Sequence, residues 1–339
     1  MRVLVTGGSG FLGGKVAESL LAEGFDVRLL MRKAKAGSPA KAEVAMGELG
    51  DLDSLRRCVK GCQAVIHCAA KCGVWGPLAD YVETNAMGTA RLLEAARQEG
   101  VSYFVYTSTL SVIYNKASLE AVTEASPYAA DPSAPYAYSK MLAERAVLLA
   151  NGPGFKTLAL RPHLIWGPGD QNLLPRIAER ARRKRLFLLS GGPYLIDAVY
   201  IDNVARAHLD ALSKLIDGAP VGGQAFFVGQ DDPQNLSQFV GRLLEAINAP
   251  PIRALLPVEL GRVSAGVFEW FWRAFGLKGE PPLTAFTVDQ LSSSHWPSVA
   301  KAKKLLGYSP KVSVDEGLAK LAEAARAGYL SPKNPPTGR

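Results

Sequence analysis

The sequence has no apolar run that could cross a membrane and no repeated or low-complexity segment. Its longest hydrophobic stretches are interrupted by charge or proline well before the roughly 20 residues that a spanning helix needs. Disordered and fibrous compositions are excluded as well, because 48% of the 339 residues are hydrophobic and 21% are charged. We therefore expect a globular protein with one large α/β domain and a smaller lobe.

Cysteine is scarce, and all four cysteines fall in one short segment. Cys58, Cys62, Cys68 and Cys72 surround His67, but their spacing is not that of a zinc finger or ribbon. The first two lie on or just after a predicted helix, whereas Cys68 follows a predicted strand and should point elsewhere. Because ligand geometry decides metal binding, we expect no metal site.

We also expect no secretory leader, because Met1 runs directly into the predicted apolar strand Val3–Val5. We therefore expect a cytoplasmic protein. The formal net charge of +8 suits an anionic cofactor, an anionic substrate or anionic lipid, without choosing among them. The densest basic cluster, within Arg176–Arg185, is expected to be a solvated helix end, where cations are favoured by the helix dipole.

Short β-branched runs alternate with longer amphipathic segments, as in a doubly wound parallel sheet. The expected strands are Val3–Val5, Val27–Met31, Val44–Met46, Ala64–His67, Tyr103–Thr107 and Thr157–Leu160. The clearest helices are Phe11–Glu23, which Gly24 can terminate, and Tyr81–Gln98.

The alternation weakens from about Asn172, where prolines begin to accumulate. We expect a nucleotide-binding core with the catalytic residues over residues 1–171. A mainly substrate-binding lobe should occupy 172–331, with some strands and helices returning to the core. The tail at 332–339 is expected to be loose.

A glycine-rich loop follows the first predicted strand. Gly7, Gly10 and Gly13 lack Cβ atoms, so the backbone there can turn tightly and approach a pyrophosphate. Phe11 and Leu12 begin the next helix, whose free amides would hold the phosphate charge. The position of the loop between a strand and a helix predicts a dinucleotide-binding site.

The end of the second predicted strand indicates which dinucleotide binds. Enzymes that prefer NAD usually have a carboxylate there for the ribose diol, but this chain has Met31, followed by Arg32 and Lys33. A guanidinium can bind a 2′-phosphate through paired charge-assisted bonds, so NADP(H) is favoured over NAD(H). Asp51 and Leu52 follow the third strand, where a short acceptor could receive the adenine amino group.

Tyr136 and Lys140 are four residues apart, which places both side chains on one face of a helix. A phenol has a reference pKa of about 10 and needs a nearby cation to exchange a proton readily near neutrality. The pair follows a strand that ends in the hydroxyl-bearing run Thr107-Ser108-Thr109. This arrangement predicts a catalytic proton donor with its supporting lysine.

These features resemble the extended short-chain dehydrogenases/reductases. The resemblance rests on the glycine loop, Tyr-Thr-Ser-Thr at 106–109, Asn85 in Asn-Ala-Met-Gly-Thr, and Tyr136 with Lys140. Leu-Arg-Pro-His-Leu-Ile-Trp-Gly-Pro-Gly-Asp at 160–170 and Tyr-Ile-Asp-Asn at 200–203 resemble the 3β-hydroxysteroid dehydrogenase branch. The resemblance covers nearly the whole chain and implies a Rossmann core with nicotinamide-dependent oxidoreductase activity.

The family's roles can be carried over to matching positions. Tyr136 would be the proton donor in reduction, and Lys140 would orient the nicotinamide ribose. Thr109 would hold the substrate oxygen, with Ser108 as the alternative, because either hydroxyl can bond a carbonyl. Pro162 would lie beside the nicotinamide carboxamide.

Ala69 and Lys71 are assigned to the cofactor side by the same resemblance, and Asn85 would support the central helix. Segments at 69–76, 172–176 and 282–284 are most similar to the reductases of bacterial long-chain olefin biosynthesis. That resemblance implies NADPH-dependent reduction of a 2-alkyl-3-oxoalkanoate to the 3-hydroxy acid. We expect this small, lipid-like molecule, and not nucleic acid, as the partner.

An aromatic stripe in the C-terminal lobe fits a lipid-like substrate. Phe268, Phe271, Trp272 and Phe275 share one predicted helix face, and Trp270 lies off it. The helix could be core, a lid over a lipid pocket, or a contact with a membrane or a pathway enzyme. An oligomer is also compatible with it.

Further pocket candidates are His163, Trp166 and His295, although single residues of these types are more often structural. Three other functions remain open from the sequence. They are a 3β-hydroxysteroid or sterol-4-carboxylate dehydrogenase, a nucleotide-sugar epimerase or dehydratase, and a redox sensor that binds NADP(H) without turnover. The intact Tyr136 and Lys140 argue against the sensor.

Replacement of Tyr136 by phenylalanine tests the catalytic assignment. The Tyr136→Phe variant should lose about two to four orders of magnitude in turnover, the range for a positioned general acid, while still binding cofactor. Cofactor fluorescence and steady-state rates measure the two properties separately. Near wild-type turnover, under conditions where chemistry limits the rate, would contradict the assignment.

Overall fold

A parallel seven-stranded sheet forms the centre of the computed structural model, which describes residues 1–33, 41–129, 131, 134–252 and 254–331. The order of the strands is β12-β7-β5-β4-β1-β2-β3. Their bounds are β1 Arg2–Thr6, β2 Asp26–Met31, β3 Glu43–Met46, β4 Ala64–His67, β5 Tyr103–Thr107, β7 Lys156–Pro162 and β12 Ala225–Val228. All six predicted strands are confirmed, whereas the predicted loose tail lies outside the described residues.

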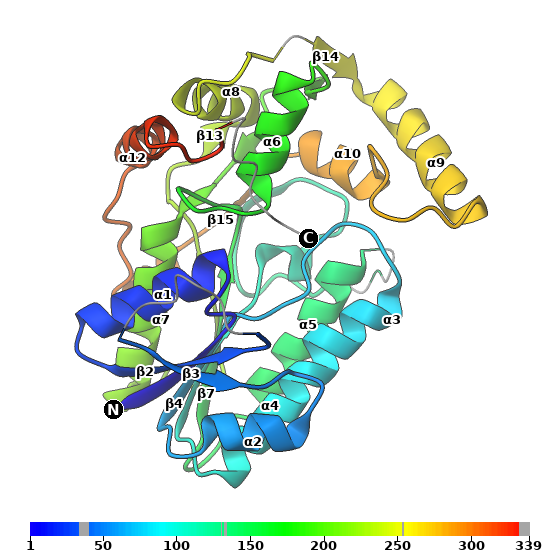
Figure 1. The fold of residues 1–339 in the computed structure, drawn as a ribbon. Coiled ribbons are helices and arrows are strands. Elements are labelled where there is room, and N and C mark those ends of the chain that lie inside the picture. Colours follow the sequence, from blue (N-terminus) through cyan, green and yellow to red (C-terminus); the bar gives the residue numbers. More distant parts are fainter. Residues whose placement is uncertain (34–40, 130, 132–133, 253, 332–339) are drawn as a thin grey trace.

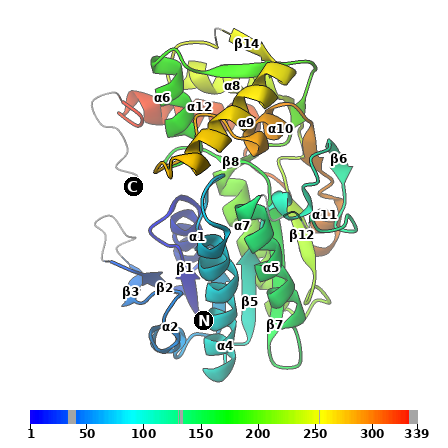
Figure 2. The ribbon, with the colours of Figure 1, turned by 90° about the vertical axis from the view of Figure 1, so that its right-hand side faces the viewer.

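Helices cover both faces of this sheet (Figures 1 and 2). One face carries α1 (Phe11–Ala22), α7 (Ile201–Ile216) and α11 (Ala300–Leu306). The other carries α2 (Leu52–Val59), α4 (Gly88–Gln98) and α5 (Pro135–Leu149). Strands buried on both sides read as continuous apolar runs, which is why the core was visible in the sequence.

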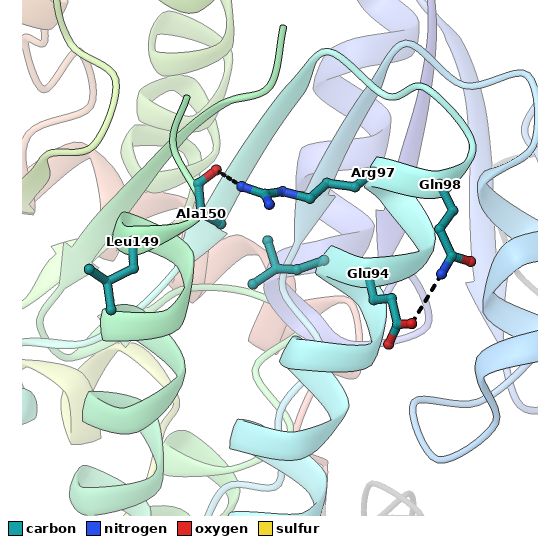
Figure 3. A pocket seen from close by; sticks show the side chains of 6 residues that line it. Glu94, Arg97, Gln98, Leu149 and Ala150 are labelled. Atoms are coloured by element: carbon teal, nitrogen blue, oxygen red, sulfur yellow. Dashed lines mark hydrogen bonds between the residues drawn. The ribbon is translucent and has the colours of Figure 1, made fainter. Parts of the chain in front are cut away.

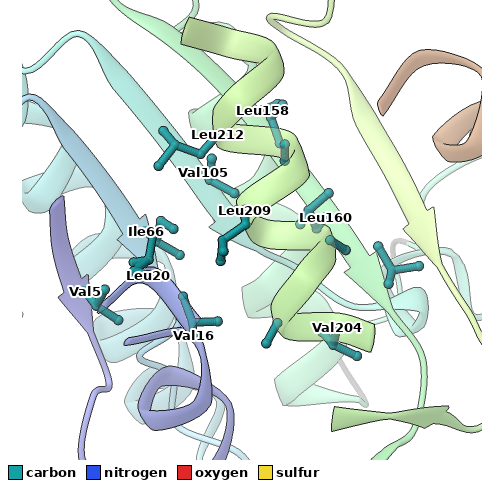
Figure 4. Packing of buried hydrophobic residues seen from close by; sticks show 14 of the residues in the cluster. Val5, Val16, Leu20, Ile66, Val105, Leu158, Leu160, Val204, Leu209 and Leu212 are labelled. Carbon is teal, nitrogen blue, oxygen red and sulfur yellow. The ribbon is translucent and has the colours of Figure 1, made fainter. Parts of the chain in front are cut away.

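The packing of α1 and α7 against the sheet is drawn in Figure 4. Val16 and Leu20 of α1 meet Val5 and Ile66 of the strands, and Leu209 of α7 lies over the middle of the sheet. These side chains are almost completely buried. The doubly wound Rossmann architecture expected from the sequence is therefore confirmed.

The predicted helix Tyr81–Gln98 is divided in the structure. It consists of α3 (Leu78–Tyr81), a π-helical turn η1 (Val82–Met87), and α4. Asn85 lies in the π-helical turn, where it receives the Lys71 amide on its Oδ1 at 2.7 Å. Wide turns of this kind are frequent at functional sites, and hydrophobic periodicity does not reveal them.

The C-terminal lobe covers the carboxyl edge of the sheet (Figure 1). Its helices are α6 (Leu173–Arg182), α8 (Leu236–Ala246), α9 (Val258–Ala274), α10 (Ala285–Leu291) and α12 (Val314–Arg326). Its short strands are β9 (Phe187–Ser190), β10 (Leu195–Ile196), β13 (Gln234–Asn235), β14 (Ala254–Pro257) and β15 (His295–Pro297), with β6 (Leu119–Val122) joining β15. Two more, β8 (Ile165–Trp166) and β11 (Val199–Tyr200), pair with each other, and a 3₁₀ turn η2 spans Leu110–Ile113.

A buried ion pair joins α5 to β7. The Arg161 guanidinium donates to both carboxylate oxygens of Glu144, at 2.6 to 3.1 Å, and the two side chains are 3% and 0% exposed. The Tyr128 hydroxyl donates to the same carboxylate at 2.7 Å. Each charge has therefore lost its water and depends on the other.

Loss of this pair should lower stability strongly. We expect Glu144→Gln to reduce the free energy of unfolding by about 3–5 kcal/mol, because it leaves a buried guanidinium uncompensated. Glu179→Gln is the matched control, since its pair with Arg183 is 59% and 64% exposed and should matter by less than about 1 kcal/mol. Urea unfolding followed by circular dichroism measures both. If both substitutions lowered the free energy of unfolding by the same amount, the buried Arg161–Glu144 pair would not have the stabilising role assigned to it.

Candidate active site

The glycine loop between β1 and α1 has the shape that a pyrophosphate requires. Gly7 has a φ of +71°, and a Cβ there would lie 2.9 Å from the Ala69 amide nitrogen. A Cβ on Gly13 would collide with the Gly7 carbonyl oxygen. Gly10 caps α1 without a side-chain hydrogen bond, so the amides that open the helix at Phe11 are left for an anion. These residues fit a dinucleotide.

The end of β2 has no carboxylate. Met31 is buried there, and Arg32 and Lys33 follow as exposed residues. Asp51 caps α2 by accepting the amides of Asp53 and Ser54 on its Oδ1. The basic pair therefore follows the position at which NAD-preferring enzymes of this fold usually have a carboxylate.

Lys140 lies on α5, and its side chain is almost completely buried. Its Nζ donates to the Thr107 carbonyl oxygen at 2.5 Å and lies 4.1 Å from the ring centroid of Tyr106. Burial lowers the pKa of Lys140 to about 8, and the nearby Cys72 partly opposes this decrease. The side chain therefore still carries its charge at neutral pH, close to the end of β5.

The hydroxyl of Tyr136 lies near the side chains of Thr109 and Cys72. Burial raises the pKa of this phenol well above its ordinary value, the neighbouring Cys72 thiol raises it further, and the Thr109 hydroxyl lowers it. Ser108 is also buried, but its hydroxyl makes no hydrogen bond within the described residues. Of the two candidates, the structure therefore brings Thr109 to Tyr136.

The sequence did not predict a role for Cys72 beside the tyrosine. Cys58 and Cys62 are buried in the hydrophobic core, whereas Cys72 is exposed. Burial raises the pKa of the Cys72 thiol, whereas Lys140 and Tyr136 lower it. No local pattern signals this contact, because it joins a loop after β4 to the start of α5.

A buried chain of hydrogen bonds connects the glycine loop with the catalytic helix. His67 lies between Thr6 and Thr89, with its Nδ1 2.6 Å and its Nε2 2.9 Å from their hydroxyl oxygens. Thr89 donates to the Asn85 carbonyl, and the Asn85 amide donates to the Ser139 hydroxyl at 2.9 Å. Burial lowers the pKa of His67 to about 3, so the ring stays neutral. This chain positions the two halves of the site.

The other predicted cofactor residues are distributed around this centre. Pro162 ends β7 beside the end of β5. The Lys71 amine binds Asp80 at 2.7 Å and lies over the ring of Tyr81, so its side chain is already engaged. Cofactor contacts of Ala69, Leu12 and Leu52 stay predictions.

A separate hollow of about 500 Å³ lies between α4 and α5, far from these residues (Figure 3). It is lined by Leu93, Glu94, Arg97, Gln98, Leu149 and Ala150. Arg97 donates to the Ala150 carbonyl and Glu94 binds Gln98, so its polar groups are satisfied by one another. Its open form and paired side chains do not suit catalysis.

Helix α9 has an exposed aromatic face. Trp270, Phe271 and Phe275 are 64%, 43% and 61% exposed, whereas Phe268 and Trp272 are only partly so. The predicted stripe is therefore not simply core. Within the described residues, no helix is long and apolar enough to span a membrane. Contact of α9 with lipid or another enzyme stays a prediction.

The parallel sheet, the glycine loop and the Tyr136–Thr109 contact define an oxidoreductase of the extended short-chain dehydrogenase/reductase class. A model of the 3-beta hydroxysteroid dehydrogenase/isomerase family matches residues 4–258, and the chain belongs to this family.

Its relatives include proteins named as reductases and as dehydrogenases. The 2-alkyl-3-oxoalkanoate reductase of Stenotrophomonas maltophilia is 39% identical over 333 residues, covering 96% of this chain and 100% of the relative. The decarboxylating sterol-4-alpha-carboxylate 3-dehydrogenase of Mus musculus is 32% identical, covering 95% and 90%. The structure of Thermus thermophilus UDP-glucose 4-epimerase with NAD is 26% identical, covers 97% and 100%, and has a TM-score of 0.72.

The position of Cys72 can be tested by alkylation. N-ethylmaleimide should abolish most of the turnover, because an adduct on Cys72 would occupy the space beside the Tyr136 hydroxyl. Its raised pKa means that the reaction should accelerate as the pH rises above neutrality. Residual activity and peptide mass spectrometry follow the modification. Cys72→Ala is the control, because N-ethylmaleimide should not change the activity of this variant. Full activity with Cys72 modified would contradict the geometry.

Proposed function

We propose that the protein uses NADPH to reduce the 3-oxo group of a long-chain 2-alkyl-3-oxo acid, giving the 3-hydroxy acid. The hydroxyl groups of Tyr136 and Thr109, which lie near each other, carry the proposal, because they offer two donors to one carbonyl oxygen. The substrate class is supported by the name of the 39% identical relative, which aligns along its whole length.

In this reaction the residues of the chain bind and protonate the ketone. Thr109 and Tyr136 would donate hydrogen bonds to its oxygen and stabilise the charge that develops there. Bound NADPH supplies the hydride. Burial and the neighbouring thiol keep the phenol of Tyr136 protonated at neutral pH, so it serves as the proton donor. The buried ammonium of Lys140 supplies positive charge on the same helix face.

The preference for NADPH over NADH is supported by the end of β2. Met31 replaces the usual carboxylate, and the exposed Arg32 and Lys33 can meet a 2′-phosphate.

The cytoplasmic location stays a prediction from the sequence.

A second candidate is a sterol-4-carboxylate or 3β-hydroxysteroid dehydrogenase, in which the same groups work in the oxidative direction. The family match and the 32% identical sterol-4-alpha-carboxylate dehydrogenase favour this alternative. Tyr136 would then accept the proton from the substrate hydroxyl.

Oxidation of a series of 2-alkyl-3-hydroxy acids tests the proposal and avoids the spontaneous decarboxylation of 3-oxo acids. Each additional buried methylene contributes up to roughly 0.8 kcal/mol, so kcat/KM should rise steeply with chain length. The rates should be higher with NADP⁺ than with NAD⁺. A flat series, or a 3β-hydroxysterol that outperforms every acid, would favour the second candidate.

A further inference from the structure

Two histidines that the proposed mechanism does not use lie together at the carboxyl edge of the sheet. His163 follows the end of β7, and His295 begins β15 in the lobe above it. Their ring centroids are 5.4 Å apart, with the ring planes at 77°. Residues 132 positions apart in the chain therefore form one imidazole pair between the core and the lobe.

The pair has unused hydrogen-bonding capacity. His295 is only 2% exposed, and neither of its ring nitrogens has a hydrogen-bond partner within the described residues. Its ring approaches the backbone of Gln290, but without the geometry of a normal hydrogen bond. His163 is partly exposed, and no side-chain bond of its ring is found among those residues either. Buried donors without partners are costly, so a ligand is expected here.

The pair lies at the same edge of the sheet as the candidate reacting groups. Thr107 of β5 pairs with Leu160 of β7, so Thr109 and His163 follow the ends of two adjacent strands. Neighbouring strands are about 4.8 Å apart. In a 3-oxo acid, two bonds of about 1.5 Å separate the carbonyl carbon from the carboxylate carbon. A substrate whose carbonyl oxygen is held by Thr109 would therefore have its carboxylate at the edge of the sheet that also carries His163.

The chemistry of the pair matches a carboxylate. Burial lowers the pKa of His163 to about 3 and that of His295 to about 4, so both rings are neutral. Each neutral imidazole has one N–H donor, and the two donors correspond to the two oxygens of a carboxylate. A sterol without an acid group would leave them unsatisfied.

We propose that His163 and His295 bind the substrate carboxylate and thereby select 3-oxo and 3-hydroxy acids over neutral ketones and alcohols. His163 contacts the acid directly, and His295 supplies the second donor from the lobe. This site rests on the proposed function, because it presupposes that the reacting group is β to an acid.

The test compares a long-chain 2-alkyl-3-hydroxy acid with its methyl ester as substrates for NADP⁺ reduction. The wild-type protein should prefer the acid by about ten- to a hundredfold in kcat/KM, the range for hydrogen bonds to a charged group. His163→Phe and His295→Phe keep a ring in the space but remove the donor. Both should bring the acid-to-ester ratio toward one, mainly through a higher KM for the acid, and His163→Asn should restore part of the preference.

His208→Phe is the control for the loss of a buried imidazole. That ring bonds Thr107 and Val204 instead of facing the pair, so its removal should leave the acid-to-ester ratio unchanged whatever it does to the rates. Thermal melts identify any variant that fails to fold, in which case the Asn variant and the wild-type ratio decide.

The outcomes separate the two proposals. Equal oxidation of acid and ester by the wild-type protein, or an equal loss of both in the Phe variants, overturns the carboxylate site and leaves the reductase function intact. Turnover of neither substrate overturns the proposed function and the site together.

Discussion

The ion pair between Arg161 and Glu144 fixes the geometry on which the site depends. Glu144 lies on α5, the helix that carries Tyr136 and Lys140, and Arg161 lies on β7. Both charges are desolvated, so α5 cannot shift along the sheet without separating them at a high cost. The tyrosine, the end of β5 and the end of β7 are thereby held in one register.

Burial has opposite effects on the two central groups of the site. It disfavours the charged form of each, which keeps the Tyr136 phenol protonated and weakens the hold of Lys140 on its proton. Neither Tyr136 nor Lys140 is therefore a strong acid before the reaction begins. Positioned hydrogen bonds can stabilise the alkoxide as it forms, and this is where such a preorganised environment has its greatest effect.

Local signals predicted much of the fold and of the site. The β-branched runs located six of the seven central strands, and the glycine loop and the spacing of Tyr136 and Lys140 indicated the candidate site. Contacts between segments that are distant in the sequence could not be predicted from these local signals. β12 returns to the sheet from the C-terminal half, Cys72 reaches Tyr136 from another loop, and the π-helical turn at Val82–Met87 contains no glycine or proline that would mark it.

The chain passes repeatedly between the core and the lobe. After α6 and β10 it returns to the core as α7 and β12, enters the lobe again at α8, returns to the core once more at α11, and then reaches the lobe at α12. A rigid swing about one linker is therefore unavailable, and any opening must bend several connections together. For the same reason, exchange of the whole lobe by recombination would need several coordinated junctions. The lobe is thus left to change by substitution of its residues.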